Sequence, residues 1–327
     1  MELAMNRTTL AAVFTLLALA PALAQQASTP PAAPPPPDFS KVEIKTTDLG
    51  DGVYMLEGQG GNMTLATAKS GAILVDSQFA PLHDKIKAAI AAVTPQPVKY
   101  LVNTHFHGDH TGGNEAFANE GATIVANVKV RTRLKKGTTN FLTGAQNPPA
   151  PKAALPTNTY THQLKLSLRG RIAELRHPDN AHTDGDTYVY FKSANVIATG
   201  DTLTNGRYPN IDVLNGGNIK GMIAATDAYL KLTNDNTKIV PGHGPLANKA
   251  ALVDYRTMLV TARDRMAKLI KDGKTEDEVL AAKPFADLDA KWAPNETASK
   301  NFIRAVYGSL AKKPWIRPWS KPWGKKS

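Results

Sequence analysis

The sequence THFHGDHTGG, residues 104–113, decides the fold that we predict for this chain. It holds three histidines and one aspartate within six consecutive positions. On a helix, His105 and His107 would point about 200° apart and would not easily share a metal ion. At the end of a strand, residues two positions apart face the same side. The apolar segment 100–102 leads directly into this pair, so we predict a strand that ends in a metal-ligand loop.

Gly108, in the same stretch, is predicted to let the chain turn so that Asp109 and His110 face a second ion. Neutral imidazole and carboxylate groups are ligands that suit Zn²⁺. The chain has no cysteine, which excludes thiolate ligands, thiol nucleophiles and disulfides. Any metal must therefore be held by His, Asp or Glu.

Later segments carry further candidate ligands, each in a glycine-containing turn beside a predicted strand. His182 lies in NAHTDGD, Asp201 follows the apolar segment 196–198, and His243 follows the segment 238–240. Functional groups concentrate on loops that a rigid scaffold positions. These side chains are therefore candidates to complete the metal site.

The predicted elements run as strands, helix, strand, helix, further strands, helix and strand, followed by a long helical end. This order favours an α/β (α+β) fold with two sheets between helices over a doubly wound parallel sheet. We place the first strand at residues 42–44. The Gly/Asn/Pro-rich stretch 137–156 is long for a loop, and such loops are often lids or binding loops.

These motifs together resemble the metallo-β-lactamase superfamily, from about Gly52 to Pro245, with its five motifs in order beginning at Asp76. The resemblance implies a four-layer αββα sandwich of two mixed β-sheets flanked by helices, here with a C-terminal helical extension. It implies two Zn²⁺ ions. In the implied site, the first ion is bound by His105, His107 and His182, and the second by Asp109, His110 and His243. Asp201 bridges both ions, and Asp76 supports the ligand loop.

The resemblance also implies a hydrolase in which a metal-bridging hydroxide attacks a carbonyl, while Asp109 orients the hydroxide and relays a proton. The best-known β-lactamases with this motif carry a cysteine where this chain has Asp201, and a lysine where it has Thr204. A bridging aspartate resembles instead the glyoxalase II, lactonase and esterase-like branches. We therefore expect a small-molecule acyl substrate, an ester, lactone or β-lactam-type compound, with weak β-lactam turnover.

Two residues in the loop that follows the bridging aspartate are candidates for substrate binding. Arg207 is a candidate clamp for a substrate carboxylate, and Tyr208 is a candidate pocket residue in the loop 205–218. The alternatives are a surface arginine and plain loop packing. The remaining histidines are expected to be structural or exposed: His83, His162 and His177.

The N-terminal segment, residues 1–24, has the pattern of a secretory signal peptide, with an apolar run at 10–20 and a small-residue cleavage site before Gln25. An uncleaved membrane anchor is the alternative. A periplasmic or secreted protein is expected after cleavage near Ala24. Residues 25–41 are rich in proline and are predicted to be a linker.

The rest of the chain divides into three predicted parts. A metallo-β-lactamase domain is assigned to 42–247, a helical extension packed on it to 248–310, and a basic Pro/Trp tail to 311–327. The tail contributes to the formal net charge of +11. Two further functions stay open: a phosphodiesterase or nuclease on the same dinuclear site, and an envelope-binding module that contacts envelope polymers or lipid headgroups through the tail. Nucleic acid is not the expected partner.

Overall fold

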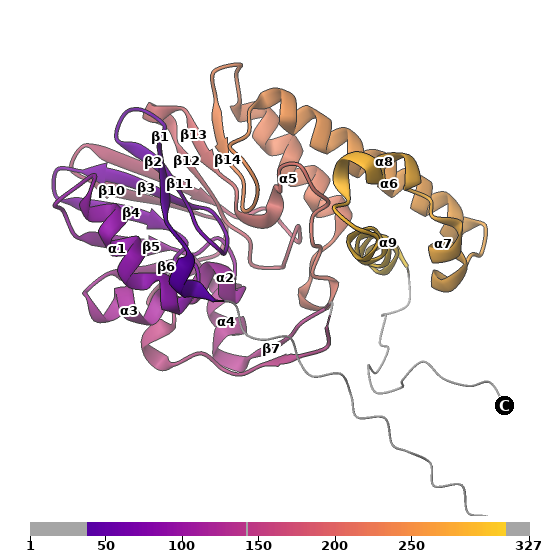
Figure 1. The fold of residues 1–327 in the computed structure, drawn as a ribbon, viewed down its shortest axis with the longest axis horizontal. Helices are drawn as coiled ribbons and strands as arrows, with labels where there is room; N and C mark the ends of the chain where they lie inside the picture. Colours follow the sequence, from indigo (N-terminus) through magenta and orange to yellow (C-terminus); the bar gives the residue numbers. More distant parts are fainter. Residues whose placement is uncertain (1–37, 142, 312–327) are drawn as a thin grey trace, which may run out of the picture. The chain divides into compact units, whose positions relative to one another are not determined.

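A computed structural model describes residues 38–141 and 143–311 (Figure 1). The predicted signal peptide, most of the predicted linker and the tail from residue 312 onward lie outside these ranges. Residues 39–41 form η1 (Phe39–Lys41), and the Phe39 ring centroid lies 5.3 Å from that of Phe79. The folded part therefore begins before residue 42. In the described ranges, every helix is too short or too polar to span a bilayer.

The first sheet has seven strands in the order β1-β2-β3-β4-β5-β6-β9. The strands are β1 (Lys45–Asp48), β2 (Val53–Glu57), β3 (Met63–Ala68), β4 (Gly71–Val75), β5 (Val98–Val102), β6 (Thr123–Asn127) and β9 (Asn158–Tyr160). Pairing is antiparallel from β1 to β4 and parallel from β4 to β9. The prediction of a strand at 42–44 is wrong, because pairing with β2 begins only at Lys45, opposite Glu57.

The second sheet has five strands in the order β10-β11-β12-β13-β14. They are β10 (Gln163–Leu168), β11 (Arg171–Arg176), β12 (Tyr188–Phe191), β13 (Val196–Ala198) and β14 (Lys238–Val240). All pairs are antiparallel except β13 with β14, which is parallel. Both large sheets are therefore mixed, as predicted.

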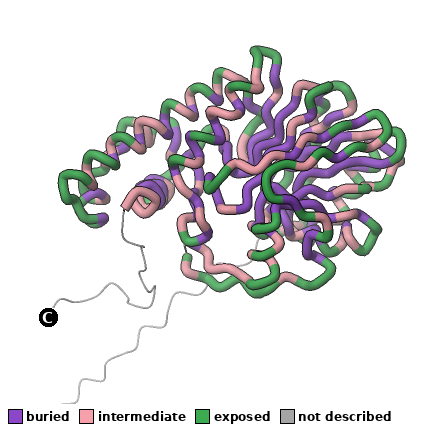
Figure 2. The backbone as a smooth tube through the Cα atoms, turned by 180° about the vertical axis from the view of Figure 1, so that it is seen from behind, coloured by how far each residue is buried: buried purple, intermediate pink, exposed green. Residues whose placement is uncertain are grey.

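The two sheets form the inner layers, and helices cover both outer faces, as Figures 1 and 2 show. Along β4, Ile73 and Val75 join the core between the sheets, whereas Leu74 joins the cluster that contains residues of α1 and α3. This alternation is the period of two that a strand buried on both faces requires. The outer helices of the first sheet are α1 (His83–Ala91) and α3 (Asn114–Asn119). The four-layer αββα sandwich is confirmed.

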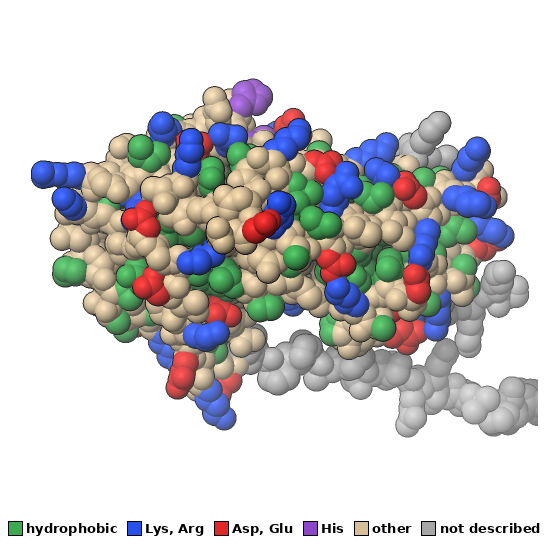
Figure 3. All heavy atoms as spheres, turned by 90° about the horizontal axis from the view of Figure 1, so that it is seen from above, with side chains coloured by type: hydrophobic (Ala, Val, Ile, Leu, Met, Phe, Trp, Pro, Cys, Tyr) green, Lys and Arg blue, Asp and Glu red, His purple; other side chains and the backbone are tan. Residues whose placement is uncertain are grey.

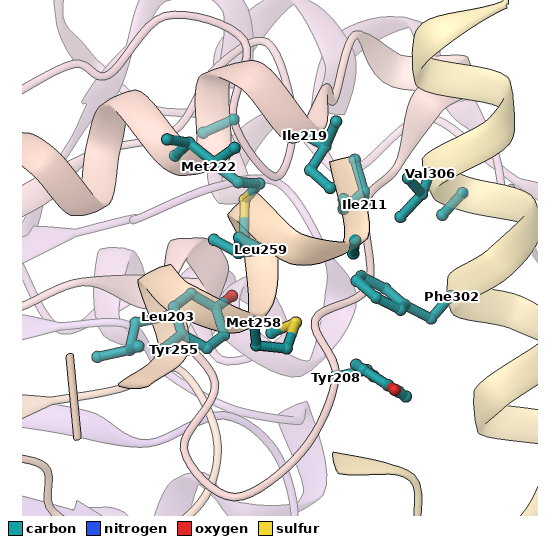
Figure 4. Packing of buried hydrophobic residues seen from close by; sticks show 14 of the residues in the cluster. Leu203, Tyr208, Ile211, Ile219, Met222, Tyr255, Met258, Leu259, Phe302 and Val306 are labelled. Atoms are coloured by element: carbon teal, nitrogen blue, oxygen red, sulfur yellow. The ribbon is translucent and has the colours of Figure 1, made fainter. Parts of the chain in front are cut away.

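The C-terminal helices share one core with the second sheet. Figure 4 shows part of this core, including Phe302 and Val306. The helices of the extension are α6 (Lys249–Lys271), α7 (Glu276–Ala282), α8 (Ala286–Trp292) and α9 (Glu296–Leu310), and α5 (Ile219–Leu232), which precedes the extension, packs in the same core. Ile197 and Ile239, on the outer face of the sheet, lie in the same cluster as Phe302 of α9. Burying one such side chain contributes about 1.5–3 kcal/mol. The predicted helical extension is therefore present and continuous with the sandwich.

The other regular elements of the described chain are short. They are α2 (Gly108–Thr111), α4 (Val128–Lys136), β7 (Thr138–Thr139), β8 (Gln146–Asn147), η2 (Ala80–Leu82), η3 (Lys152–Ala154), η4 (Lys192–Ala194), η5 (Gly200–Thr202) and η6 (Val213–Asn215). The stretch 137–156, predicted as a loop, contains the β7–β8 hairpin and η3.

The topology explains why distant candidate ligands meet. Asp76 and His105 follow β4 and β5, which run parallel, and Asp201 and His243 follow β13 and β14, which also run parallel. The loop with His182 joins β11 to β12, and β12 is antiparallel to β13. This loop therefore lies at the same edge of the sheet as the end of β13.

Candidate metal centre

The first group of ligand atoms comes from three histidines and Asp201. His107 Nδ1 lies 3.1 Å from His105 Nε2 and 3.0 Å from His182 Nε2. Asp201 Oδ2 lies 3.7 Å from His182 Nε2 and 4.0 Å from His105 Nε2. Four ligands about 2.1 Å from a tetrahedral zinc ion would be separated by about 3.4 Å. The group therefore has the size of a metal site.

The second group comprises Asp109, His110 and His243. His243 Nε2 lies 3.1 Å from Asp109 Oδ2 and 3.4 Å from His110 Nε2. His110 Nε2 lies 3.6 Å from Asp109 Oδ2. The structure thus brings together the seven residues that the sequence analysis proposed as ligands.

The carboxylate of Asp201 lies between the two groups. Its Oδ1 is 3.1 Å from His110 Nε2, and its Oδ2 is 3.4 Å from His243 Nε2 as well as 3.7 Å from His182 Nε2. Oδ1 is fully buried and has no well-aligned hydrogen-bond donor in the described residues. A buried carboxylate oxygen without a donor is costly unless a cation compensates it. The chain's residues therefore fit a metal pair that shares Asp201.

The three histidines of the first group each have an oxygen partner on the ring nitrogen that faces away from the site. His105 Nδ1 lies 3.1 Å from Thr104 Oγ1. His107 Nε2 lies 2.9 Å from Asp212 Oδ2, and His182 Nδ1 lies 2.6 Å from the carbonyl oxygen of Asn210. Such partners fix the tautomer and leave the other nitrogen available to a metal.

Sequence reasoning did not identify Asp212 or Asn210. It placed the loop 205–218 near the metals, but no spacing rule pairs a residue of that loop with His107, which lies 105 positions earlier. The Asp212 carboxylate is buried, and Asn215 Nδ2 donates to it over 2.8 Å. Only the path of the loop in three dimensions assigns it to the site.

Asp76 supports the ligand loop from the end of β4. Its Oδ1 accepts from the Thr104 backbone N–H, and its Oδ2 accepts from the Thr104 hydroxyl, both over 2.7 Å. Oδ2 also lies 2.8 Å from His110 Nδ1, which turns His110 Nε2 toward the site. Asp76 has φ of 63°, an uncommon conformation for a non-glycine residue that surrounding bonds must stabilise.

Two glycines line the site so closely that neither has room for a side chain. A Cβ on Gly61 would lie 2.0 Å from His110 Cε1, and one on Gly242 would lie 2.0 Å from Asp201 Oδ1. Gly108 is different, because its added Cβ would meet no atom within 4 Å and its φ lies outside the left-handed region. The chain turns at Gly108 into α2, and Asp109 and His110 join the second group as predicted, but the ordinary helical geometry at residue 108 does not require glycine.

The ligands differ in how far they reach solvent. The side chains of His107, Asp109 and His243 are 18%, 26% and 20% exposed. Those of His105, His110 and His182 are at most 1% exposed. The centre is therefore open to solvent on the side of the first three residues.

Burial and neighbouring charges shift the pKa values of these groups. Burial lowers the pKa of His105 well below its usual value and that of His182 to about 4. For His110, burial is outweighed by the charge of Asp201 and by Asp109 and Asp76, so its pKa lies well above the usual value. Burial of His243 is outweighed by Asp201 and Asp109, which raise its pKa to about 9.

Loading the metal-free protein near pH 7 is expected to release protons. His243, with a pKa of about 9, and His110, whose pKa is raised, are protonated at that pH, yet a metal requires neutral imidazole. We expect about two protons per loaded chain from these imidazoles, in addition to the proton lost by metal-bound water, and tighter binding as pH rises toward 9. Titration calorimetry in buffers of different ionisation enthalpy measures the proton count. Metal uptake without proton release would contradict the assignment of these two histidines as ligands.

The two residues proposed to bind substrate differ in solvent exposure. Arg207 is exposed. Tyr208 is buried, its hydroxyl donates to Asp289 Oδ1 over 2.9 Å, and its ring stacks on Phe302. The structure therefore places Tyr208 in the core shared with α8 and α9, not among the metal ligands. Of the other histidines, His162 is exposed, His83 contacts Glu120 and His177 Nδ1 contacts the carbonyl oxygen of Asp186.

The strand ends of this four-layer sandwich bring together two His/Asp groups around one shared carboxylate. This arrangement defines a class of α/β proteins with a metal site. A family model described as the metallo-β-lactamase superfamily matches residues 56–243, more than half of the chain. The chain belongs to this superfamily. The relatives of this chain include proteins named as hydrolases.

Curated relatives are distant, and this chain covers only part of each. A linear primary-alkylsulfatase of Pseudomonas sp. is 21% identical over 74% of this chain and 52% of its own length. A hydroxyacylglutathione hydrolase of Polaromonas sp. is 28% identical over 57% of this chain and 63% of its own length. The chain thus spans only about half to two thirds of these proteins.

Solved structures of low identity share the fold. A metallo-β-lactamase from Pontibacter korlensis matches with a TM-score of 0.56 and 19% identity, covering 67% of this chain and 99% of that protein. A stereoselective inverting sec-alkylsulfatase from Pseudomonas sp. matches with a TM-score of 0.59 and 19% identity, covering 81% of this chain and 50% of that protein. These likenesses support the fold.

Proposed function

We propose that this protein is a secreted, zinc-dependent hydrolase that binds two zinc ions and cleaves an ester, a lactone or a β-lactam-type carbonyl. The observation that carries the proposal is the position of the Asp201 carboxylate, within 4 Å of histidines from both ligand groups. Two zinc ions held there would supply a nucleophile at neutral pH and polarise the substrate oxygen. Membership of a superfamily with hydrolase relatives supports this reading.

Asp109 is the proposed catalytic residue. Its carboxylate is partly exposed on the open side of the centre. Burial raises its pKa, but the charge of His110 and a hydrogen bond from His243 outweigh burial, so its pKa is lowered to about 2. Asp109 is therefore ionised at neutral pH and can accept a hydrogen bond from an attacking water, which orients the water toward a bound carbonyl.

The residues around Asp201 favour neutral acyl substrates over penicillin-like drugs. Thr204, where well-known β-lactamases have a lysine, is buried, and its hydroxyl donates to the carbonyl oxygen of Arg207 over 3.1 Å. It has no positive charge to hold a substrate carboxylate. Arg207 itself is exposed and remains the proposed clamp for substrates that carry one.

A second candidate is the hydrolysis of sulfate esters. The alkylsulfatase relative aligns with 74% of this chain, a longer part than the 57% covered by the hydroxyacylglutathione hydrolase. Phosphodiesters stay an alternative for the same site. The face in Figure 3 carries Lys and Arg side chains mixed with Asp and Glu, so this face has no continuous basic stripe of the kind that binds nucleic acid.

A hydrolysis panel on metal-quantified protein tests the proposal. We expect turnover of lactones or aryl esters to exceed turnover of β-lactams, alkyl sulfates and bis-p-nitrophenyl phosphate. Exhaustive chelation is expected to abolish that turnover, and zinc is expected to restore it, because the nucleophile requires the metal. Acyl hydrolysis that survives verified metal loss would reject the mechanism. Turnover of alkyl sulfates alone would select the second candidate.

A further inference from the structure

The loop 205–218 supplies two supports to the first group of ligands. Asp212 Oδ2 lies 2.9 Å from His107 Nε2, and the carbonyl oxygen of Asn210 lies 2.6 Å from His182 Nδ1. Both contacts act on the ring nitrogen opposite the one that faces the site. The orientation of two metal-binding imidazoles therefore depends on where this loop lies.

The C-terminal helices hold this loop through Tyr208. The Tyr208 backbone N–H donates to the carbonyl oxygen of Trp292 over 2.7 Å, and the Tyr208 hydroxyl donates to Asp289 Oδ1 over 2.9 Å. The Tyr208 ring is stacked on Phe302 with centroids 4.1 Å apart and planes 12° apart (Figure 4). Asp289 Oδ2 also accepts from Ser299 Oγ over 2.8 Å, so one carboxylate links α8, α9 and the loop.

Further contacts hold the loop at Asp212 and beyond it. Ile211 is fully buried in the same cluster as Val306 of α9 (Figure 4). Asn215 Nδ2 donates to Asp212 Oδ2 over 2.8 Å. Asn218, the last residue of the loop, donates from Nδ2 to the carbonyl oxygen of Ser309 over 2.9 Å. The loop is thus fixed to α8 and α9 on both sides of Asp212.

We propose that α8 and α9 support the metal site indirectly. They hold the loop 205–218 in place, so that Asp212 and the Asn210 carbonyl orient the imidazoles of His107 and His182. Tyr208 and Asp212 are positioning residues, and neither touches the substrate. An unanchored loop would sample many conformations, and the ordering cost would be subtracted from metal binding. The inference rests on the proposed function only in requiring that the first group binds a metal.

Cobalt binding tests this inference without any substrate. Each variant is titrated with Co²⁺ against a competing chelator, and the visible absorption of the loaded protein reports ligand geometry. Asp212→Ala is expected to weaken binding to the first group by about 10–100-fold, the usual effect of removing an outer partner. Asp212→Asn is expected to recover part of that loss, because an amide oxygen can still accept from His107 Nε2.

Tyr208 is tested with graded variants and a matched control. Tyr208→Ala is expected to weaken Co²⁺ binding about tenfold and to change the absorption spectrum. Tyr208→Phe, which keeps the stacked ring and loses the bond to Asp289, is expected to have a smaller effect. The control is Val279→Ala, which truncates a buried side chain of the same cluster on α7, outside the loop and the two helices that hold it.

The outcomes separate this inference from the proposed function. The inference is overturned if Asp212→Ala binds Co²⁺ as tightly as the unchanged protein, or if Val279→Ala weakens binding as much as Tyr208→Ala. Unchanged affinity and spectrum in Tyr208→Ala would also overturn it. If the protein binds Co²⁺ tightly but hydrolyses nothing in the panel, only the proposed function is refuted. The Co²⁺ affinities of the variants would still test the positioning roles of Asp212 and Tyr208.

Discussion

Asp201→Asn is expected to lose bound zinc from both ligand groups and to lower acyl hydrolysis more than about 100-fold. The expected loss exceeds that of an outer partner, because Asp201 contacts histidines of both groups directly. The amide has the same shape but no negative charge, so two dications would be held with one fewer anion. Metal per chain by atomic emission and kcat/KM on the best ester measure the effect.

The matched control for this variant is Asp264→Asn. Asp264 is 61% exposed and pairs with Arg263 on α6, and an exposed pair of this kind contributes only about 0–1 kcal/mol. We expect the control to keep its zinc and its activity. Two zinc ions per chain in Asp201→Asn would show that neither ion needs the negative charge of this carboxylate, and the bridging role assigned to Asp201 would fail.

Gly61→Ala is expected to displace His110 and to remove metal from the second group. The new Cβ would lie 2.0 Å from His110 Cε1 and 2.4 Å from Nε2. Neither partner can move freely: the Gly61 N–H donates to the Asp109 carbonyl, its own carbonyl accepts from Gln78 Nε2, and Asp76 holds the His110 ring. Such overpacking costs about 1–3 kcal/mol. We expect a lower melting temperature and about half of the metal content.

Gly108→Ala is the contrasting variant. It lies in the ligand motif itself, yet a Cβ there meets nothing within 4 Å and the backbone is helical. We expect unchanged zinc content and a stability within about 0.5 kcal/mol, with a slight gain from the better helix former. A reversed outcome, with Gly108→Ala losing metal and Gly61→Ala keeping it, would show that the second group is built differently. Melting curves and metal analysis decide between them.

The candidate ligands and the presence of two sheets between helices follow from local patterns, whereas the four-layer αββα sandwich was implied by the resemblance to the metallo-β-lactamase superfamily. Residues two apart at a strand end share a face, which is why His105 and His107 were predictable as a pair. His182, Asp201 and His243 stood out because each lies in a glycine-containing turn beside a predicted strand. Such signals involve neighbours in the chain, so no knowledge of distant contacts was needed to find them.

Some local interpretations failed for a physical reason. The strand expected at 42–44 depends on pairing, and pairing starts three residues later, at Lys45. The chain does turn at Gly108, but the backbone conformation there is one that other residues also adopt. Tyr208 was proposed as a pocket residue because its loop follows Asp201 in the chain and was expected near the metals. In the structure the Tyr208 ring is buried and stacks on Phe302.

The available metal ligands could be predicted from local sequence: the imidazoles and carboxylates, the absence of any thiol, and the strand ends that present these groups. The supports of these groups could be found only from the folded chain: Asp212, Asn210, Gly61 and Gly242. These residues act across contacts between segments far apart in the chain, and only the packing of the folded loops and helices sets such distances.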